Sequence, residues 1–326
     1  MQSYIVDAHY DLLCDVFRLR RKGERKVIER FYHDDWKSSG FNVLICSLFV
    51  SDAYLPEMAL KVAMEQIGML HCEMEESPGL FALCRSAADV EKTVRSGRTA
   101  LLLSFEGVEP LGKSLVLLRA FYELGVRFVG LTWSRRNYAA DGCHFRPIRE
   151  GAPGGLTSFG VSLLEEAERL GMIIDVSHLN DAGFADVAKF ATKPFIASHS
   201  NARSLCGVAR NLTDGQIAAL SSSGGVIGLN NMINFVFPKD GETGGDGCEG
   251  LLKHARHMIE LVGPDHVGFG LDLCEFEKPE DARDRSVFPT YRHTRPFIEL
   301  VRREFSSDIS DKILGGNWMR VIDTLR

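Results

Sequence analysis

Residues 4–11 read Tyr4-Ile5-Val6-Asp7-Ala8-His9-Tyr10-Asp11, a short apolar run that leads into metal-type side chains. A run of this kind is typical of a buried strand. Side chains two apart on a strand share a face, so His9 and Asp11 point the same way, with Cα atoms about 7 Å apart. An imidazole and a carboxylate aimed at one point form half of a divalent metal site. Because such triplets are common by accident, a polar turn after an edge strand is the better explanation of this one alone, and other ligands must decide.

Seven further apolar runs recur along the chain, and amphipathic stretches lie between most of them. This alternation predicts a parallel β/α architecture, and eight strands fit a (β/α)8 TIM-type barrel. A doubly wound sheet is the alternative. We therefore predict an α/β protein with one barrel domain over residues 1–326. The predicted strands are residues 4–8, 43–50, 99–105, 126–132, 172–177, 194–198, 224–229 and 266–271, and the predicted helices are 56–76, 111–124, 157–170, one from 213, 249–262 and 310–325.

Composition narrows the class of protein. The 326 residues are 45% hydrophobic and 25% charged, which is ordinary for a globular domain. A formal net charge of −6 argues against nucleic-acid and anionic-membrane partners. Eight scattered cysteines without a C-x-x-C pair indicate reduced, packed thiols. With no secretion signal and no apolar stretch of membrane-spanning length, we expect a cytoplasmic enzyme.

The candidate ligands fall at the ends of the predicted strands. In a β/α barrel, the carboxyl ends of the strands meet at one rim, where the chemistry of such proteins gathers. Six metal-type or acid/base residues share this rim, and such a coincidence is improbable by chance. They are His9 and Asp11 after the first strand, Glu106 after the third, His178 after the fifth, His199 after the sixth and Asp272 after the eighth.

This mix of side chains suits a two-metal hydrolase. Three histidines and several carboxylates can hold two divalent ions if one carboxylate bridges them, and Glu106 is the natural bridge. Two such ions lower the pKa of a shared water and polarise a carbonyl. The donor set suits zinc, with manganese or cobalt as alternatives. Asp272 could carry a proton from water to a leaving amine, and Arg210 near the rim suggests a substrate with a free carboxylate.

With these residues in place, the chain resembles the membrane dipeptidase (renal dipeptidase) family of zinc metallopeptidases, within the amidohydrolase-like barrels. The resemblance runs over nearly the whole chain, and its motifs occur together and in order. The motifs are Asp7-Ala8-His9-Tyr10-Asp11, Ser104-Phe105-Glu106-Gly107, Asp175-Val176-Ser177-His178, Ser198-His199-Ser200-Asn201-Ala202, Arg210-Asn211, Gly268-Phe269-Gly270-Leu271-Asp272 and Gly315-Gly316-Asn317.

The resemblance implies a binuclear zinc dipeptidase on a (β/α)8 barrel. It implies a small dipeptide as substrate, of which an L-Xaa-D-Xaa dipeptide is a plausible form, and a possible homodimer. It also implies a role for each matched residue. His9 and Asp11 would bind one Zn²⁺ and His178 and His199 the other, with Glu106 bridging; Asp272 would be the acid/base, Arg210 would receive the substrate carboxylate, and Asn317 would contact substrate.

One departure from the family bears on substrate choice. Renal-type members have a histidine, associated with the substrate, after the Leu-Thr pair of the fourth strand, where this chain has Trp133. Trp133 offers one N–H and is bulkier, so we expect it to line the substrate pocket, and Asn137 or His144 could supply the missing polar contact. The alternatives are an amidohydrolase for N-acyl-amino acids, small amides or lactones, and a non-enzymatic metal-binding barrel.

Overall fold

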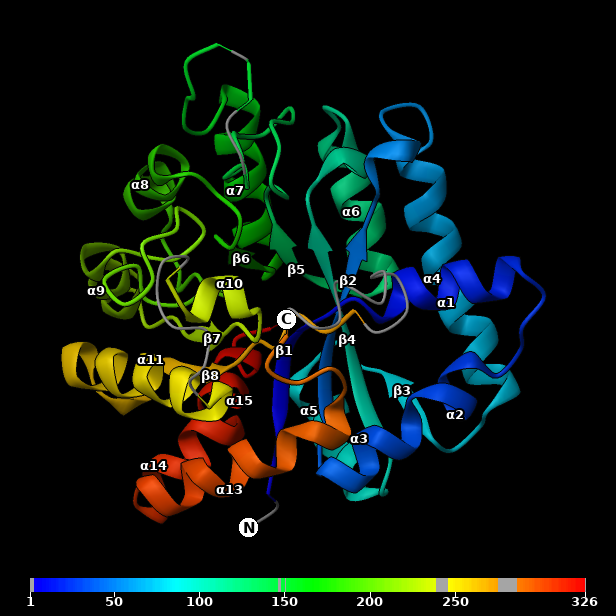
Figure 1. Cartoon of the computed structure of the whole chain (residues 1–326). Helices are drawn as coiled ribbons and strands as arrows, with labels where there is room; N and C mark the ends of the chain where they lie inside the picture. The colour runs from blue at the N-terminus through cyan, green and yellow to red at the C-terminus, as the bar shows by residue number, and fades with distance from the viewer. Residues whose placement is uncertain (1–2, 146–147, 150, 239–245, 275–285, 326) are drawn as a thin grey trace.

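Seven of the eight apolar runs form parallel strands at the centre of the computed structural model, which describes residues 3–145, 148–149, 151–238, 246–274 and 286–325 (Figure 1). Their β-branched and leucine-rich sequences are buried on both faces, as a parallel sheet covered by helices requires. The strands are β1 (Val6–Tyr10), β2 (Val43–Phe49), β3 (Phe81–Leu83), β4 (Thr99–Glu106), β5 (Val126–Gly130), β6 (Ile173–Asp175), β7 (Ile227–Leu229) and β8 (Val267–Phe269).

The sheet closes into a ring. Its strands follow the order β6-β5-β4-β2-β1-β8-β7. The segment 194–198 completes the ring, because Ile196 pairs in parallel with Asp175 of β6 and Ala197 with Ile227 of β7. Seven strands and the segment 194–198, which together are called the eight staves of the barrel, therefore surround one interior. They coincide with the eight runs predicted from sequence. The barrel is confirmed, and the doubly wound alternative is wrong because an open sheet would leave β6 and β7 as edges.

The strand β3 lies outside this ring and was not predicted. It pairs with residues 99–101 of β4, whereas β5 pairs with β4 from Leu103 onward. The two strands thus share one edge of β4, with β3 below β5. A three-residue strand that is only partly buried carries too little periodic signal to be recognised from sequence.

Helices surround the barrel (Figure 1). Five of the six predicted helices are α4, α6, α7, α9 and α11, and the capping box at Thr213 and Gln216 opens α9 as expected. The predicted helix 310–325 is split into three pieces. The helices are α1 (Leu12–Arg21), α2 (Val27–Phe31), α3 (His33–Ser39), α4 (Ala59–Glu76), α5 (Ala87–Arg95), α6 (Leu115–Leu124), α7 (Ser158–Leu170), α8 (Asp181–Phe190), α9 (Asp214–Ser222), α10 (Ile233–Val236), α11 (Gly247–Val262), α13 (Arg295–Glu304), α14 (Ser307–Asp311) and α15 (Asn317–Ile322), with the π turn η5 (Lys312–Gly316) and the 3-10 turns η1 (Asp52–Tyr54), η2 (Glu109–Leu111), η3 (Pro264–His266) and η4 (Tyr291–Thr294).

Side chains alternate between the two faces of each strand, so they form two apolar cores and determine which residues reach the site. In β4, Leu101, Leu103 and Phe105 belong to the larger apolar cluster, between sheet and helices. Ala100 and Leu102 belong to a second cluster that fills the barrel, which Trp318 of α15 also joins. The inward series 100, 102, 104, 106 therefore rises from an apolar floor to the carboxylate of Glu106.

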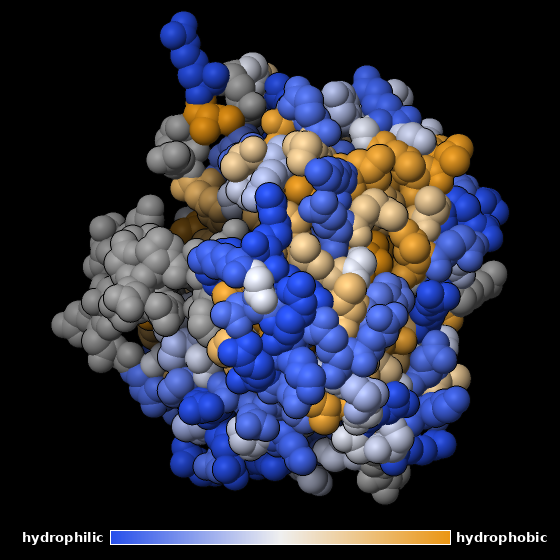
Figure 2. Space-filling view, turned by 90° about the vertical axis from the view of Figure 1, so that its right-hand side faces the viewer, coloured by the Kyte–Doolittle hydropathy of each residue, from blue (hydrophilic) through white to orange (hydrophobic). Residues whose placement is uncertain are grey.

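The surface is mostly hydrophilic on the side that carries α1, α2 and α4, with an apolar area toward one upper edge (Figure 2). Leu60 and Met64 of α4 and Val116 of α6 are exposed apolar side chains. Among the described helices, none is both long enough and apolar enough to cross a bilayer. All eight cysteines are free thiols; six of them are buried, whereas Cys248 is half-buried and Cys72 is exposed and so is not packed.

Close packing on one side of the ring predicts a severe effect of Gly270→Ala. A Cβ at Gly270 would lie 1.7 Å from the carbonyl oxygen of Ser198, which is backbone and cannot yield cheaply. We expect the free energy of unfolding to fall by about 3 kcal/mol in urea denaturation. Gly68→Ala is the control, because an added Cβ on this exposed glycine of α4 meets nothing within 4 Å. It should stabilise by about 0.5–1 kcal/mol, and equal effects of the two changes would contradict the packing argument.

The buried His254 of α11 predicts a pH-dependent stability. Its Nδ1 accepts from Ala202 N–H and its Nε2 donates to the Val236 carbonyl, so the ring must be neutral. Burial lowers the pKa of His254 to about 4. A depressed histidine pKa means that its contribution is complete above pH 6.5 and is lost as pH falls toward 4. We expect about 2 kcal/mol less stability at pH 5 than at pH 7, a loss that His254→Gln removes and His71→Gln, on the exposed side of α4, does not.

Candidate metal centre and active site

The six predicted rim residues converge on one point. His9 and Asp11 follow or end β1, Glu106 ends β4, and Asp272 follows β8. The ligand atoms form three overlapping groups, in each of which every atom lies within 4.8 Å of the others. The groups are His9, Asp11 and Glu106; Glu106, His178 and His199; and His9, His199 and Asp272.

Glu106 belongs to two of these groups and lies between them. Its Oε2 is 3.5 Å from His9 Nε2, and its Oε1 is 3.1 Å from His178 Nε2 and 4.0 Å from His199 Nε2. His9 Nε2 is also 3.5 Å from Asp11 Oδ1. The two oxygens of one carboxylate thus face two separate sets of ligands, which is the arrangement a bridging carboxylate needs.

Burial sets the electrostatics of the cluster. Burial and, to a smaller extent, the negative charge of Asp11 raise the pKa of Glu106 to about 8, against the opposing effect of His9. Burial opposes the charged form of His9, but Glu106 and Asp11 outweigh it and hold the pKa of His9 well above its ordinary value. Burial, with Arg210 nearby, lowers the pKa of His178 well below its ordinary value. A buried carboxylate whose ionised form is this costly gains from a bound cation.

The donor set fits divalent metal ions. Both ring nitrogens of His9 are buried and lack a hydrogen-bond partner among the described residues. The Nε2 atoms of His178 and His199 are only 2.9 Å apart, on the side of the rings that faces Glu106 Oε1. Unpaired buried imidazole nitrogens next to carboxylate oxygens are metal-ligand chemistry, and this mixture of nitrogen and oxygen suits zinc.

A hydroxyl group orients each of three ligands, a feature that the sequence analysis missed. Second contacts of this kind fix the orientation of a metal ligand and tune its affinity. Two of the serines hold the imidazole nitrogen that points away from the cluster. The pairs are Ser47 Oγ with Asp11 Oδ1, Ser134 Oγ with His178 Nδ1 at 2.7 Å, and Ser198 Oγ with His199 Nδ1 at 2.7 Å.

Asp175 joins two staves beneath His178 and His199. Its Oδ1 accepts the backbone N–H groups of Ser177 and Ser198, both at 2.9 Å, and its Oδ2 accepts the Ser198 hydroxyl. Since Ser198 also contacts His199, Asp175 positions this imidazole through the serine. This aspartate belongs to the motif Asp175-Val176-Ser177-His178, but nothing in the spacing of the motif indicates that Asp175 positions His199.

Asp7 joins the ends of β1 and β8 through hydrogen bonds in a similar way. Its Oδ1 accepts the N–H groups of His9 and Leu271, and its Oδ2 accepts the Tyr291 hydroxyl at 2.6 Å. Burial raises the pKa of Asp7 to about 6 against these hydrogen bonds. The carboxylate therefore holds the ends of two staves, one leading to His9 and the other to Asp272.

Two site residues have left-handed backbone conformations. His178 has φ +69° and Asp272 has φ +58°. Non-glycine residues adopt this region at a cost, and such residues cluster at functional sites. Here the turn brings each side chain back over the rim directly after its strand.

Arg210 and Asp272 lie beside the ligands. Arg210 is buried and donates to the Ser200 hydroxyl and the His199 carbonyl, at 2.9 and 2.8 Å. Its Nε is buried without a hydrogen-bond partner among the described residues. Asn230, which the sequence analysis did not select, donates to Asp272 Oδ2 at 3.1 Å and so orients that carboxylate.

Trp133 lies in an aromatic wall next to His178. Its ring centroid is 6.1 Å from that of His178, 5.2 Å from Phe49 and 5.5 Å from Phe145. Phe145 stacks on Phe235 at 6.1 Å, and the Arg210 guanidinium lies 5.8 Å from the Phe235 ring. The wall therefore runs from one ligand histidine to the arginine.

The structure does not bring Asn317 to this site. Asn317 begins α15, and its amide donates to the Pro264 and Val267 carbonyls at 2.7 and 2.8 Å. Val267 opens β8, so Asn317 lies at the opposite end of that stave from Asp272, and the expected substrate contact is wrong. Asn137 is also occupied, because its amide bonds to three backbone groups of its own loop.

Fold and cluster together define a metal-dependent hydrolase on a β/α barrel. Residues 1–326 match the membrane dipeptidase family, peptidase family M19, and the chain belongs to that family. The chain is 32% identical to dipeptidase verJ of Clonostachys rogersoniana, over 85% of this chain and 68% of that one. It is 34% identical to an uncharacterised protein in the pqqA 5′ region of Klebsiella pneumoniae, over 82% of this chain and 97% of that one.

Solved structures of two relatives have the same architecture. One is the dipeptidase AC, a family M19 metallopeptidase, with a TM-score of 0.87 and 28% identity over 100% of this chain and 99% of that one. The other is a Rhodobacter sphaeroides metallopeptidase bound to a phosphinate mimic of the dipeptide L-Ala-D-Ala. It has a TM-score of 0.85 and 28% identity over the whole of both chains. The protein is thus a metallopeptidase of the dipeptidase type.

The serine contacts predict a measurable loss of metal affinity. Ser198→Ala removes the group that holds both His199 Nδ1 and Asp175, so we expect metal binding to weaken by about 10–100-fold. Competition with a chromogenic chelator measures this affinity. Ser222→Ala on α9, whose hydroxyl only donates to its own helix at Ala218, is the control. Unchanged affinity in Ser198→Ala would contradict the positioning role.

Proposed function

We propose that the protein is a binuclear zinc dipeptidase that hydrolyses small dipeptides with a free carboxylate. The observation that carries this proposal is Glu106, which lies in two ligand groups at once with Arg210 and Asp272 beside them. His9 and Asp11 would hold one ion and His178 and His199 the other. Ions bound there lower the pKa of water and polarise the peptide carbonyl.

Asp272 would move the proton. Its carboxylate lies within reach of both His9 and His199, which belong to different metal sets. Asn230 fixes one oxygen of the carboxylate and so sets its orientation. An oriented carboxylate at this place can take a proton from the attacking water and deliver it to the leaving amine.

Arg210 would bind the carboxylate of the substrate. Burial lowers its pKa, opposed by Asp272, but a guanidinium remains charged in proteins. The contacts to Ser200 and His199 position the group, and its Nε still lacks a partner among the described residues. A bidentate carboxylate is the natural ligand for such a fork.

The stereochemistry of the substrate is a finer proposal. An L-Xaa-D-Xaa dipeptide is supported by the phosphinate mimic of L-Ala-D-Ala bound to the Rhodobacter sphaeroides relative. The aromatic wall from Trp133 to Phe235 favours a second possibility, an N-acyl-amino acid, whose apolar acyl group the wall could contact while Arg210 holds its carboxylate. The predicted homodimer and cytoplasmic location stay predictions.

Metal removal and a substrate panel test the proposal directly. We expect chelation to abolish hydrolysis of L-L and L-D dipeptides and Zn²⁺ to restore it. The panel includes N-acyl-amino acids, with released amino acid as the readout for both classes. Zinc-loaded protein that hydrolyses no dipeptide would contradict the dipeptidase, and faster turnover of N-acyl-amino acids would favour the second possibility.

Two variants separate the proposed roles of Arg210 and Asp272. Arg210→Ala should raise KM for dipeptides by about 100-fold, because a charge-assisted contact is lost, and should no longer distinguish a dipeptide from its C-terminal amide. Asp272→Asn should lower kcat by about 100-fold or more and leave zinc content unchanged; asparagine tolerates the left-handed backbone at this position. An Asp272→Asn variant with full kcat would contradict the acid/base role.

A further inference from the structure

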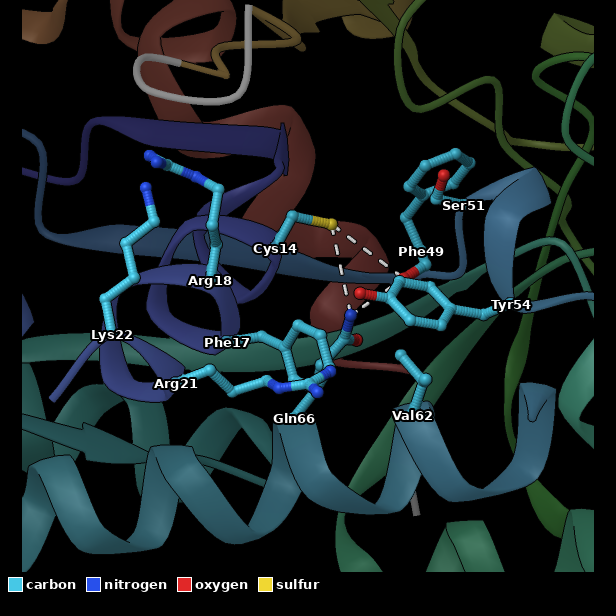
Figure 3. Close-up of a pocket in the computed structure, with 10 residues that line it drawn as sticks. All are labelled: Cys14, Phe17, Arg18, Arg21, Lys22, Phe49, Ser51, Tyr54, Val62 and Gln66. Carbon is cyan, nitrogen blue, oxygen red and sulfur yellow. Dashed lines mark hydrogen bonds between the residues drawn. The ribbon is translucent and has the colours of Figure 1, made fainter.

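A cavity lies between α1, α4 and the loop after β2 (Figure 3). Its volume is about 250 Å³. Phe17 of α1, Val62 of α4 and Tyr54 of η1 supply an apolar interior, and the rings of Phe17 and Tyr54 meet edge to face at 5.9 Å. A flat aromatic or branched group suits these walls.

One side of the cavity is cationic. Arg18 and Arg21 of α1 and Lys22, which directly follows this helix, line it, and Figure 3 shows all three on the α1 side. The Asp15 carboxylate is 3.6 Å from Arg18 Nη2, a loose ion pair, and within the described part of the chain the Nε and Nη2 of Arg18 have no hydrogen-bond partner. Arg21 lies 5.1 Å from the Phe17 ring. Within the described ranges, neither Arg21 nor Lys22 has an ion pair, so the cavity carries excess positive charge.

The floor presents an unpaired acceptor. Gln66 of α4 is 1% exposed, and its Nε2 donates to the Phe49 carbonyl at 2.8 Å. Its Oε1 is buried and has no hydrogen-bond partner among the described residues. The Cys14 thiol is directed at the same Phe49 carbonyl, at 3.8 Å, and does not satisfy Oε1. A buried acceptor in this state calls for an O–H or N–H donor.

We propose that this cavity binds a small aromatic carboxylate that carries a hydrogen-bond donor at its far end. The carboxylate would lie at Arg18 and Lys22, the ring against Phe17 and Tyr54, and the donor at Gln66 Oε1. The Phe49 side chain lines the cavity and also contacts Trp133 in the wall of the metal site, with ring centroids 5.2 Å apart. The cavity is therefore separate from the metal ligands and goes beyond the dipeptidase activity.

Calorimetric titration with three related probes tests each part of the proposal. We expect saturable binding of 4-hydroxyphenylacetate to the zinc-loaded protein, and the same affinity after chelation, because no metal ligand lines the cavity. Phenylacetate should bind about tenfold more weakly, since it leaves Gln66 Oε1 unpaired, and neutral 4-hydroxyphenylacetamide at least about tenfold more weakly. Binding that disappears with zinc would place the probe at the metal site and overturn the proposal.

Variants locate the bound probe. The double variant Arg18→Gln/Lys22→Gln changes exposed or half-exposed cations and should weaken 4-hydroxyphenylacetate binding by about tenfold or more. Arg95→Gln/Arg119→Gln, whose arginines pair with Glu91 and Glu123 on α5 and α6, is the matched control and should bind normally. Val62→Phe fills the cavity and should abolish binding in a variant that circular dichroism shows to be folded. Wild-type affinity in both cavity variants, or no saturable binding of any probe to the parent protein, would overturn the proposal.

Discussion

Burying the Glu106 carboxylate at the carboxyl end of β4 costs free energy, because the charged group loses its hydration and is almost inaccessible to solvent. The surrounding structure offsets this cost. Three imidazoles contact the carboxylate or lie near it, and hydroxyl groups orient two of them from behind. A polar network in a barrel interior is stable only when it is nearly complete, so the serines and Asp175 are as necessary as the ligands they hold.

Close backbone packing between β7, β8 and the segment 194–198 supports the same network. Glycines at 228 and 270 allow β7 and β8 to approach the Ser198 carbonyl so closely that any Cβ would collide with it. That approach closes the ring beside His199, and Asp7 fixes β8 against β1 through Leu271. Closure and site geometry thus depend on the same contacts, and ligands far apart in the chain meet because the staves cannot slide independently.

Much of this arrangement could be predicted from sequence because two simple periodicities govern it. Buried parallel strands appear as apolar runs, and side chains alternate, so a polar residue directly after a run lies at the rim. The same rules do not predict which side chains of different staves contact each other. Nothing in the spacing of Ser134 indicates that its hydroxyl reaches His178, and α1 begins immediately after Asp11 without a distinct signal. The expected position of Asn317 was wrong because this residue lies in a helical segment. The rule that polar residues at strand ends reach the rim does not apply there, and only the family motif suggested a role.

The proposed metal ligands and the proposed substrate contacts lie on different parts of this fold. The proposed ligands His9, Asp11, Glu106, His178 and His199 and the proposed acid/base Asp272 lie at the ends of staves or shortly after them. The register of the staves is set by backbone pairing on both sides. Trp133, Phe145, Arg210 and Phe235 lie in loops or a short helix above the rim. A loop residue can change without disturbing a stave, so tryptophan can replace the family histidine at position 133 while every ligand keeps its place. We therefore infer that the strands constrain the proposed chemistry, whereas the aromatic wall that the loops bring to Arg210 would govern the choice of substrate.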